Sequence, residues 1–283
     1  MISPPVLDFV PRYAPSIAAG ALGAVSFGER VPETVHVPLR QLGGETLIEV
    51  WPAINGDVMF GSVAVEETKP LEELTRETYA RLIDEVRNAG YPYFLRMWNH
   101  VGALNEHERG LERYQLFCAG RHDAFVAAGY HHDVDLPAAS AVGTRGRGLV
   151  TYYLAAREPG VQIENPRQVS AYHYPRQYGA KSPSFSRATI WRDTLFVSGT
   201  SSVVGHETMH AGDVVAQLEE TLRNIETLVP LDSIVAAKTY IRRASDYDVI
   251  APRLANVFRS NLFLEAGVCR AELLLEIEAV ARR

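Results

Sequence analysis

The chain has 283 residues, of which 47% are hydrophobic and 22% charged, and its formal net charge is −6 at pH 7. These proportions are typical of a soluble globular protein with one large domain or two domains of ordinary size. The acidic balance and the lack of a basic run argue against general nucleic-acid binding, so an anionic small substrate would need local arginines.

Two cysteines, Cys118 and Cys269, lie far apart in the sequence, which does not suggest a disulfide framework. Residues 1–15 contain no basic segment followed by an apolar run, so we expect no signal peptide. The sequence contains no run of roughly 20 apolar residues that would span a membrane. We therefore expect a cytoplasmic protein that binds neither membranes nor nucleic acid.

The first half of the chain alternates predicted strands and helices. The predicted segments are short strands in 45–65 around an Asn-Gly-Asp turn, a helix at 70–89, a strand at 91–100 and a helix at 105–129. Gly90 and Gly129 follow the two helices as stop signals, and Asn105 is the expected cap of the second.

The second half repeats this order. Its predicted segments are a hairpin at 188–200, a helix at 213–229, a strand at 233–242, a helix at 245–258 and a strand at 269–281. The repeat predicts two similar α+β units, divided near residues 159–166, where turn residues cluster.

The last predicted strand, Cys269 to Ala281, carries three glutamates among apolar residues. Because side chains alternate along a strand, Glu272, Glu276 and Glu278 share one face, opposite a fully apolar face. Two interpretations fit: a half-buried strand with a wet face, or a carboxyl that lines a cleft.

Two histidine-containing segments resemble metal sites. The segment HETMH, His206 to His210, matches the zinc-protease pattern, which needs both histidines one turn apart on a helix and a third ligand. Gly205 before it and Gly212 after it indicate that the next helix begins only after His210, so we expect no metal. The segment HHDVD, residues 131–135, predicts a solvated turn, because adjacent histidines in an extended loop diverge.

The segment from Glu164 to Arg192 gathers basic and aromatic side chains. They are Arg167, Arg176, Lys181, Arg187 and Arg192, with Tyr172, Tyr174 and Tyr178. Guanidinium groups bind carboxylates through two hydrogen bonds and tyrosines offer apolar faces, so the segment suits a small ligand with carboxylates and a ring. The alternative is a surface loop whose arginines pair with the protein's own acids.

Longer strings resemble a known family. The ending LLLEIEAVARR, with SGT, a helix and KTYIRRASDYDVI before it, resembles the RidA/YjgF superfamily of small α+β enamine and imine hydrolases. The strings YFLRMWNHVGALNEHERGLERYQLFCAGRHDAF, ENPRQVSAYHYPRQYGAKSPSFSRA, SGTSSVVGHET and GVCRAELLLEIEA resemble the chorismatases, a subgroup that hydrolyses chorismate. Together they span most of the sequence from about Tyr91 onward.

The resemblance implies an α+β fold of two RidA/YjgF-like units, each a mixed sheet with helices packed on one face. We expect residues 1–160 to form a degenerate N-terminal unit and residues 161–283 a C-terminal unit that carries the active site. The resemblance also implies no cofactor and no metal. Because the superfamily commonly forms trimers, it predicts a homotrimer, unless two units in one chain satisfy part of that interface.

The resemblance further implies roles for individual residues. Glu276, the first glutamate of EIEA, matches the catalytic acid, and Cys269 matches a position that faces the substrate ring in members that make 3-hydroxybenzoate. Ser182 matches a position that helps to set the product, where the family carries alanine or glycine. The remaining expected substrate-pocket residues are Tyr153, Lys181 and Arg187.

Chorismate carries two carboxylates, a ring and an enolpyruvyl ether, and protonation of the enol methylene would start the release of pyruvate. That step needs a protonated acid near neutrality, so we expect a raised pKa at Glu276 and a structural or exposed Glu278. Attack by water would give a dihydroxycyclohexadiene acid, whereas attack by the ring hydroxyl or elimination would give 3- or 4-hydroxybenzoate. Cys269 and Ser182 favour the subgroup that makes both hydroxybenzoates.

Two other functions fit the same residues. One is imine or enamine hydrolysis as in RidA, although the arginine that RidA carries has no clear counterpart in SNLFLEAGVCR, residues 260–270. The other is a non-catalytic protein in which Glu276 only hydrogen-bonds a metabolite.

Overall fold

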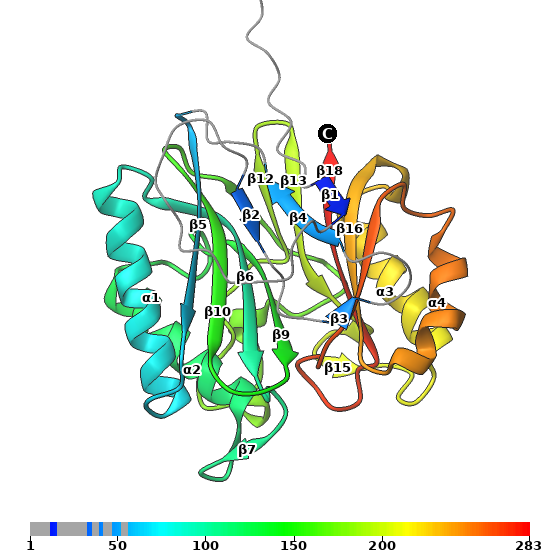
Figure 1. The fold of residues 1–283 in the computed structure, drawn as a ribbon, viewed down its shortest axis with the longest axis horizontal. Coiled ribbons are helices and arrows are strands. Elements are labelled where there is room, and N and C mark those ends of the chain that lie inside the picture. The colour runs from blue at the N-terminus through cyan, green and yellow to red at the C-terminus, as the bar shows by residue number, and fades with distance from the viewer. Residues whose placement is uncertain (1–11, 16–32, 36–39, 42–46, 52–55) are drawn as a thin grey trace, which may run out of the picture.

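The computed structural model of the chain describes residues 12–15, 33–35, 40–41, 47–51 and 56–283, the first four segments by their backbone only. Two mixed sheets lie side by side, and each is covered on its outer face by two helices (Figure 1). None of the helices described is long and apolar enough to cross a membrane.

The first unit contains a four-stranded sheet in the order β5-β10-β6-β9. Its elements are β5 (Val58–Val65), α1 (Leu71–Asn88), β6 (Tyr93–Gly102), α2 (Arg113–Ala127), β9 (Ala138–Thr144) and β10 (Leu149–Ala156). β6 and β9 run parallel, and β10 pairs antiparallel with β5 and β6. The helices bury residues such as Tyr79, Ile83 and Phe117 against one face of this sheet.

The second unit contains a seven-stranded sheet in the order β11-β12-β13-β18-β16-β17-β3. Its elements are β3 (Arg40–Gln41), β11 (Val161–Ile163), β12 (Ala188–Trp191), β13 (Thr194–Thr200), α3 (Val214–Leu228), β16 (Ile234–Ile241), α4 (Tyr247–Leu254), β17 (Asn261–Glu265) and β18 (Leu275–Arg282). β16 and β17 run parallel, and β18 pairs antiparallel with β13 and β16. Leu218, Ile225 and Ile250 pack from the helices onto this sheet.

The two units share one topology. The strands β13-β18-β16-β17 match β5-β10-β6-β9 in order and direction, and α3 and α4 occupy the chain positions of α1 and α2. The predicted α+β fold of two similar units, each a mixed sheet with helices on one face, is confirmed. Each unit also has one strand that the sequence did not predict, β9 in the first and β17 in the second.

Three predictions need correction: the starts of two elements and the pairing of one hairpin. The helix expected at 105–129 begins at Arg113, because residues 107–112 form the hairpin β7 (His107–Glu108) and β8 (Leu111–Glu112). The last strand begins at Leu275 and not at Cys269. The hairpin expected in 45–65 is wrong, because β4 (Leu47–Trp51) pairs with β1 (Arg12–Pro15) and β2 (Glu33–Val35), whereas β5 pairs with β10. Its residues 52–55 lie outside the described residues.

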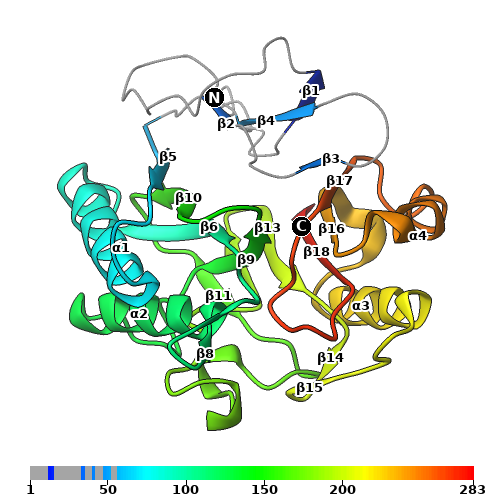
Figure 2. The same cartoon turned by 60° about the horizontal axis from the view of Figure 1, so that its bottom comes forward.

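The sheets contact each other through their inner faces. Trp98 and Tyr152 from the first sheet join Phe196 and Val280 from the second in one buried cluster. Because side chains alternate along β18, the residues with even numbers near its start face the first unit and the odd-numbered ones face α3 and α4. Figure 2 shows the small sheet β1-β4-β2 to one side of these layers.

Candidate active site

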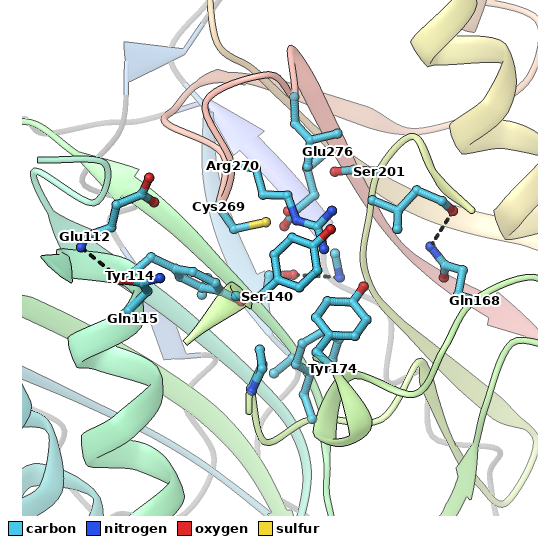
Figure 3. Close-up of a pocket in the computed structure, with 18 of the residues that line it drawn as sticks. Glu112, Tyr114, Gln115, Ser140, Gln168, Tyr174, Ser201, Cys269, Arg270 and Glu276 are labelled. Atoms are coloured by element: carbon cyan, nitrogen blue, oxygen red, sulfur yellow. Dashed lines mark hydrogen bonds between the residues drawn. The ribbon is translucent and has the colours of Figure 1, made fainter. Parts of the chain in front are cut away.

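A cavity of about 220 Å³ lies where the two units meet. The first unit contributes the start of α2 and the middle of β9, and the second contributes the loop before β12, the end of β13, the loop before β18, and β18 itself. Glu276, Cys269 and Arg270 point into one space, which Tyr174 faces from the opposite side (Figure 3). Residues of both units therefore line the cavity. The division at residue 160 and the assignment of the active site to the second unit stay predictions.

Glu276 is a buried carboxyl at the base of this cavity, with 5% of its surface exposed. Its Oε1 atom is buried and has no hydrogen-bond partner among the described residues. Burial raises the pKa of Glu276 to about 8, and the charge of Glu278 adds to this rise while Arg96 opposes it. The side chain is therefore a neutral acid at pH 7 with an oxygen available to a ligand.

Because Gly199 has no side chain, the Glu276 carboxyl can occupy the space beside it. The pairing of β13 with β18 shifts register between Val197 and Thr200, so the chain bulges beside Glu276. A Cβ atom on Gly199 would overlap Oε1 of Glu276 and approach Oγ of Ser140. The Ser-Gly-Thr segment thus gives the acid its room.

Glu278, on the same face of β18, is saturated with hydrogen bonds. Trp98 Nε1 and Lys238 Nζ lie 2.6 and 2.9 Å from its Oε1. Arg96 Nη2, Ser140 Oγ and Tyr240 OH donate to its Oε2 over 2.7, 2.5 and 3.1 Å. Burial alone would raise the pKa of Glu278, but the charges of Lys238 and Arg96 and these bonds lower it to about 2. Glu278 is a buried structural anion, as one of the two expectations held.

Three arginines line the cavity, Arg121, Arg187 and Arg270, and none of their guanidinium groups forms a salt bridge within the part of the chain that the structure describes. The backbone N–H of Arg187 donates to the Glu164 carboxyl over 3.3 Å. Arg187 Nη2 donates to the hydroxyl of Tyr174 over 2.9 Å, and its Nε is buried and unpaired. The Arg270 guanidinium lies 4.0 Å from the ring centroid of Tyr178. Guanidinium groups that line a cavity and form no salt bridge with the described residues suit an anionic ligand.

Three of the six predicted site residues, Glu276, Cys269 and Arg187, line the cavity. Burial raises the pKa of the Cys269 thiol to about 12, and the nearby Glu276 adds to the rise. Cys269 is therefore a neutral thiol at pH 7, which suits contact with a ring and not nucleophilic attack.

Tyr153 does not line the cavity, which corrects the expectation for this residue. Its side chain faces α1 and α2, where its ring packs edge-on against Phe94 with centroids 5.2 Å apart. The neighbouring Tyr152 points to the other face of β10, between the sheets. The alternation of side chains on one strand thus removes Tyr153 from the site.

Lys181 and Ser182 also lie outside the lining, next to the lining residue Pro183, and their expected roles in substrate binding stay predictions. Lys181 Nζ pairs with Asp123 Oδ2 over 2.5 Å and is partly exposed. Ser182 Oγ donates to the carbonyl of Tyr174 over 3.4 Å. Both residues fasten the loop that brings Tyr174 and Pro183 to the cavity.

Several lining residues were missed from the sequence. Tyr114 and Arg121 are seven residues apart on α2 and so project from the same side of the helix. Their spacing could have been read from the sequence, but the partner of that helix face could not. Ser140 lies on β9, which was not predicted, and Arg270 belongs to the segment that we expected to be strand.

The HETMH segment is not on a helix. Glu207 and Thr208 form β15, which pairs with β14 (Val203–Val204), and α3 begins only at Val214. His206 and His210 therefore lack the helical spacing that the zinc pattern requires. The described residues contain no group of three or more His, Cys, Asp or Glu side chains that could hold a metal.

Comparison with known proteins agrees with this geometry. The family described as chorismatase FkbO/Hyg5-like, N-terminal, matches residues 42–155. A 3-hydroxybenzoate synthase of Streptomyces hygroscopicus is 38% identical over 255 residues, which cover 81% of this chain and 75% of that protein. A chorismatase of Streptomyces rapamycinicus is 34% identical, with 90% of this chain and 88% of the relative covered.

A crystal structure of a chorismatase matches 96% of this chain and 98% of its own, with a TM-score of 0.82 and 28% sequence identity. The fold and the site thus define an α+β protein with a buried acid in a cavity between two sheets. The chain belongs to the chorismatase FkbO/Hyg5-like family. The resemblance identified from the sequence is confirmed.

Proposed function

We propose that the protein is a chorismatase that releases pyruvate from chorismate and forms 3-hydroxybenzoate, 4-hydroxybenzoate or both, with Glu276 as the general acid. The observation that carries this proposal is the buried Glu276 carboxyl, whose Oε1 has no hydrogen-bond partner among the described residues and which lines a cavity together with three arginines whose guanidinium groups form no salt bridge there. A curated relative named 3-hydroxybenzoate synthase, 38% identical, supports the choice of product.

The arginines account for substrate binding. Two carboxylates on chorismate need two cationic partners, and Arg121, Arg187 and Arg270 enter the cavity from three different segments. Tyr174 and Phe185 add aromatic surface against which the ring can rest. Binding through guanidinium groups keeps the substrate carboxylates away from Glu276. A carboxylate beside Glu276 would raise its pKa further and make it a weaker proton donor.

The reaction begins when Glu276 gives its proton to the methylene carbon of the enolpyruvyl group, which leaves an oxocarbenium ion at the ether carbon. For hydroxybenzoate products, the ring then loses its bond to the ether oxygen and one proton as it becomes aromatic, and pyruvate leaves. No water is consumed overall, because chorismate divides into pyruvate and hydroxybenzoate. The proton lost from the ring balances the proton that Glu276 supplied.

Cys269 supports an aromatic product. Its neutral thiol lines the cavity near Glu276 and fills space in which a water molecule could otherwise form hydrogen bonds. Excluding that water favours reaction within the substrate over hydrolysis to the dihydroxycyclohexadiene acid. Ser182 does not line the cavity, so we infer that it affects the product only through the loop it fastens.

Chromatography of the products made from chorismate tests the proposal. The purified protein should release pyruvate and one or both hydroxybenzoates in equal total amounts, while Glu276→Gln should release almost none. Turnover of an enamine in place of chorismate would support the RidA-like alternative. A thermal shift with chorismate but no product would show a binding protein instead.

A homotrimer and a cytoplasmic location stay predictions. The proposed reaction needs no cofactor, since it is an acid-catalysed cleavage without redox change.

A further inference from the structure

We propose that Glu278 is a positioning residue that keeps the proton on Glu276 by holding a fixed negative charge two residues away on the same face of β18. The inference rests on the proposed role of Glu276 as general acid. It assigns to the second glutamate of this strand a part in the chemistry, beyond its hydrogen bonds in the core.

The surroundings of Glu278 make it a permanent anion. Five donors saturate its two oxygens, and all five come from buried side chains. Two of them, Arg96 and Lys238, are cations that reach it from different strands, β6 and β16. Because each oxygen already accepts hydrogen bonds, this carboxylate stays ionised at the pH values at which the protein would work.

Glu276 has no such partners among the residues that the structure describes. Its register neighbour on β16 is Tyr240, whose hydroxyl donates to Glu278 and not to Glu276. On the loop side it faces Cys269, a neutral thiol. The charged groups that act on it are Glu278 and Arg96, and the rest of the cavity wall carries Arg121, Arg187, Arg270, Glu112 and the exposed Glu272. Of these, Glu278 has the strongest effect on its proton, ahead of the opposing Arg96.

Ser140 connects the two glutamates in space. Its hydroxyl donates to Glu278 Oε2 and accepts the backbone N–H of Gly199 over 3.1 Å. Gly199 in turn packs against the Glu276 carboxyl. Through Ser140, Glu278 thus holds the Gly199 backbone that contacts Glu276, and its charge also sets the electrostatic environment of Glu276.

This arrangement explains how the acid is restored after each turnover. Once Glu276 has given its proton to carbon, two carboxylates share one face of a buried strand, which is unfavourable in a medium of low polarity. Glu276 then takes up the proton that the ring releases. The fixed charge of Glu278 therefore favours the neutral form both before and after the reaction.

Two substitutions of opposite electrostatic sign test the proposal. Glu278→Gln removes the anion and leaves Arg96 and Lys238, so the pH at which kcat/KM falls to half should drop by about one pH unit or more. Lys238→Met removes a cation and exposes Glu276 to more of the Glu278 charge, so the same midpoint should rise. Glu219→Gln, on the exposed side of α3, makes the same chemical change as the first variant and should not move it.

The carboxyl of Glu276 can also be titrated without substrate. In protein labelled with ¹³C at the glutamate carboxyls, the signal lost in Glu276→Gln identifies residue 276, and its NMR midpoint should shift as described above. This measurement keeps the two proposals separable, because it succeeds even if chorismate is not turned over. Midpoints that stay at the wild-type value in both variants would overturn the role of Glu278.

A folding defect would not hide the answer. Thermal unfolding identifies a variant that fails to fold, and Lys238→Met tests the proposal alone if Glu278→Gln does not fold. A merely structural role predicts lower stability in both variants with unmoved midpoints, whereas the proposed role predicts midpoints that move in opposite directions.

Discussion

Glu276 and Glu278 lie on one face of the same strand, yet they hold opposite protonation states. The difference comes from their partners: five donors surround Glu278, whereas Oε1 of Glu276 has none among the described residues. Burial therefore stabilises the neutral form of one carboxyl, and nearby cations stabilise the charged form of the other. In the proposed mechanism, Glu276 is the general acid, whereas Glu278 is a buried anion held by hydrogen bonds.

Glu276 should make the protein less stable at high pH. Its pKa of about 8 lies above the ordinary value of 4.5, so the folded state binds its proton more tightly than the unfolded state does. The free energy of unfolding should fall as the pH rises from about 4.5 to about 8, by up to about 5 kcal/mol, and this contribution should then level off.

Glu276→Gln removes this penalty, because its amide stays neutral. The variant should unfold at a higher temperature than wild type at pH 9, and the difference should shrink toward pH 5. Thermal unfolding at the two pH values measures both. An equal difference at pH 5 and pH 9 would contradict a raised pKa at this site.

Gly199→Ala should separate activity from stability. The new methyl group would displace the Glu276 carboxyl, which is the end of a side chain and can move at little cost to the fold. We expect kcat/KM for chorismate to fall about 100-fold, since a small misplacement of a reacting group has effects of this size. Adding the substitution to Glu276→Gln should cause no further loss, and a large further loss would show that Gly199 acts in another way.

At the scale of elements, the sequence pattern predicted those helices and turns that are stabilised by contacts between residues close in the chain. The helical spacing of apolar residues and Gly90 located α1, and Asp213, which accepts hydrogen bonds from Val215 and Ala216, marks the start of α3 as expected. The hairpin of β12 and β13 turns at Arg192 and Asp193 as predicted.

The segment 269–274 shows why other elements could not be predicted. Its alternating pattern indicates strand, but Arg242 holds it as a loop by donating to the carbonyls of Val268, Arg270 and Leu273 over 2.7 to 2.8 Å. Arg242 is distant in sequence, so a tertiary contact overrides the local pattern. The same loop carries Cys269 and Arg270 into the cavity.

Arg242→Met should therefore weaken substrate binding through the loop. We expect a higher KM for chorismate and a loss of about 2 kcal/mol or more in the free energy of unfolding, since buried carbonyls lose a charged donor. Arg243→Met, at the exposed neighbouring position, serves as the control and should change neither. Steady-state kinetics and denaturant unfolding measure the two effects, and a normal KM in Arg242→Met would contradict this role for the loop.

At the scale of the whole molecule, the site depends on the contact between the two units. Glu276, Cys269 and Arg187, which the resemblance indicated, line the same cavity, and their roles toward a substrate stay predictions. The sequence could not predict Arg121 or Ser140, since nothing local shows which helix and strand of the first unit face the second.

The shared buried surface also predicts that the units unfold together. Phe196 of the second sheet is 1% exposed and packs among residues of the first. Phe196→Ala should lower the free energy of unfolding by about 3–5 kcal/mol and retain a single transition. Fluorescence and circular dichroism followed in denaturant should give coincident curves, and two separate transitions would show that the units are independent.

The release of pyruvate from chorismate by wild type and by Glu276→Gln tests the central role of the acid most directly. Wild type should lose activity as the pH rises through about 8, because Glu276 must carry its proton to react. The variant should be slower by about 100-fold or more at every pH, as expected for a removed general acid. Turnover by Glu276→Gln close to that of wild type would contradict the assignment.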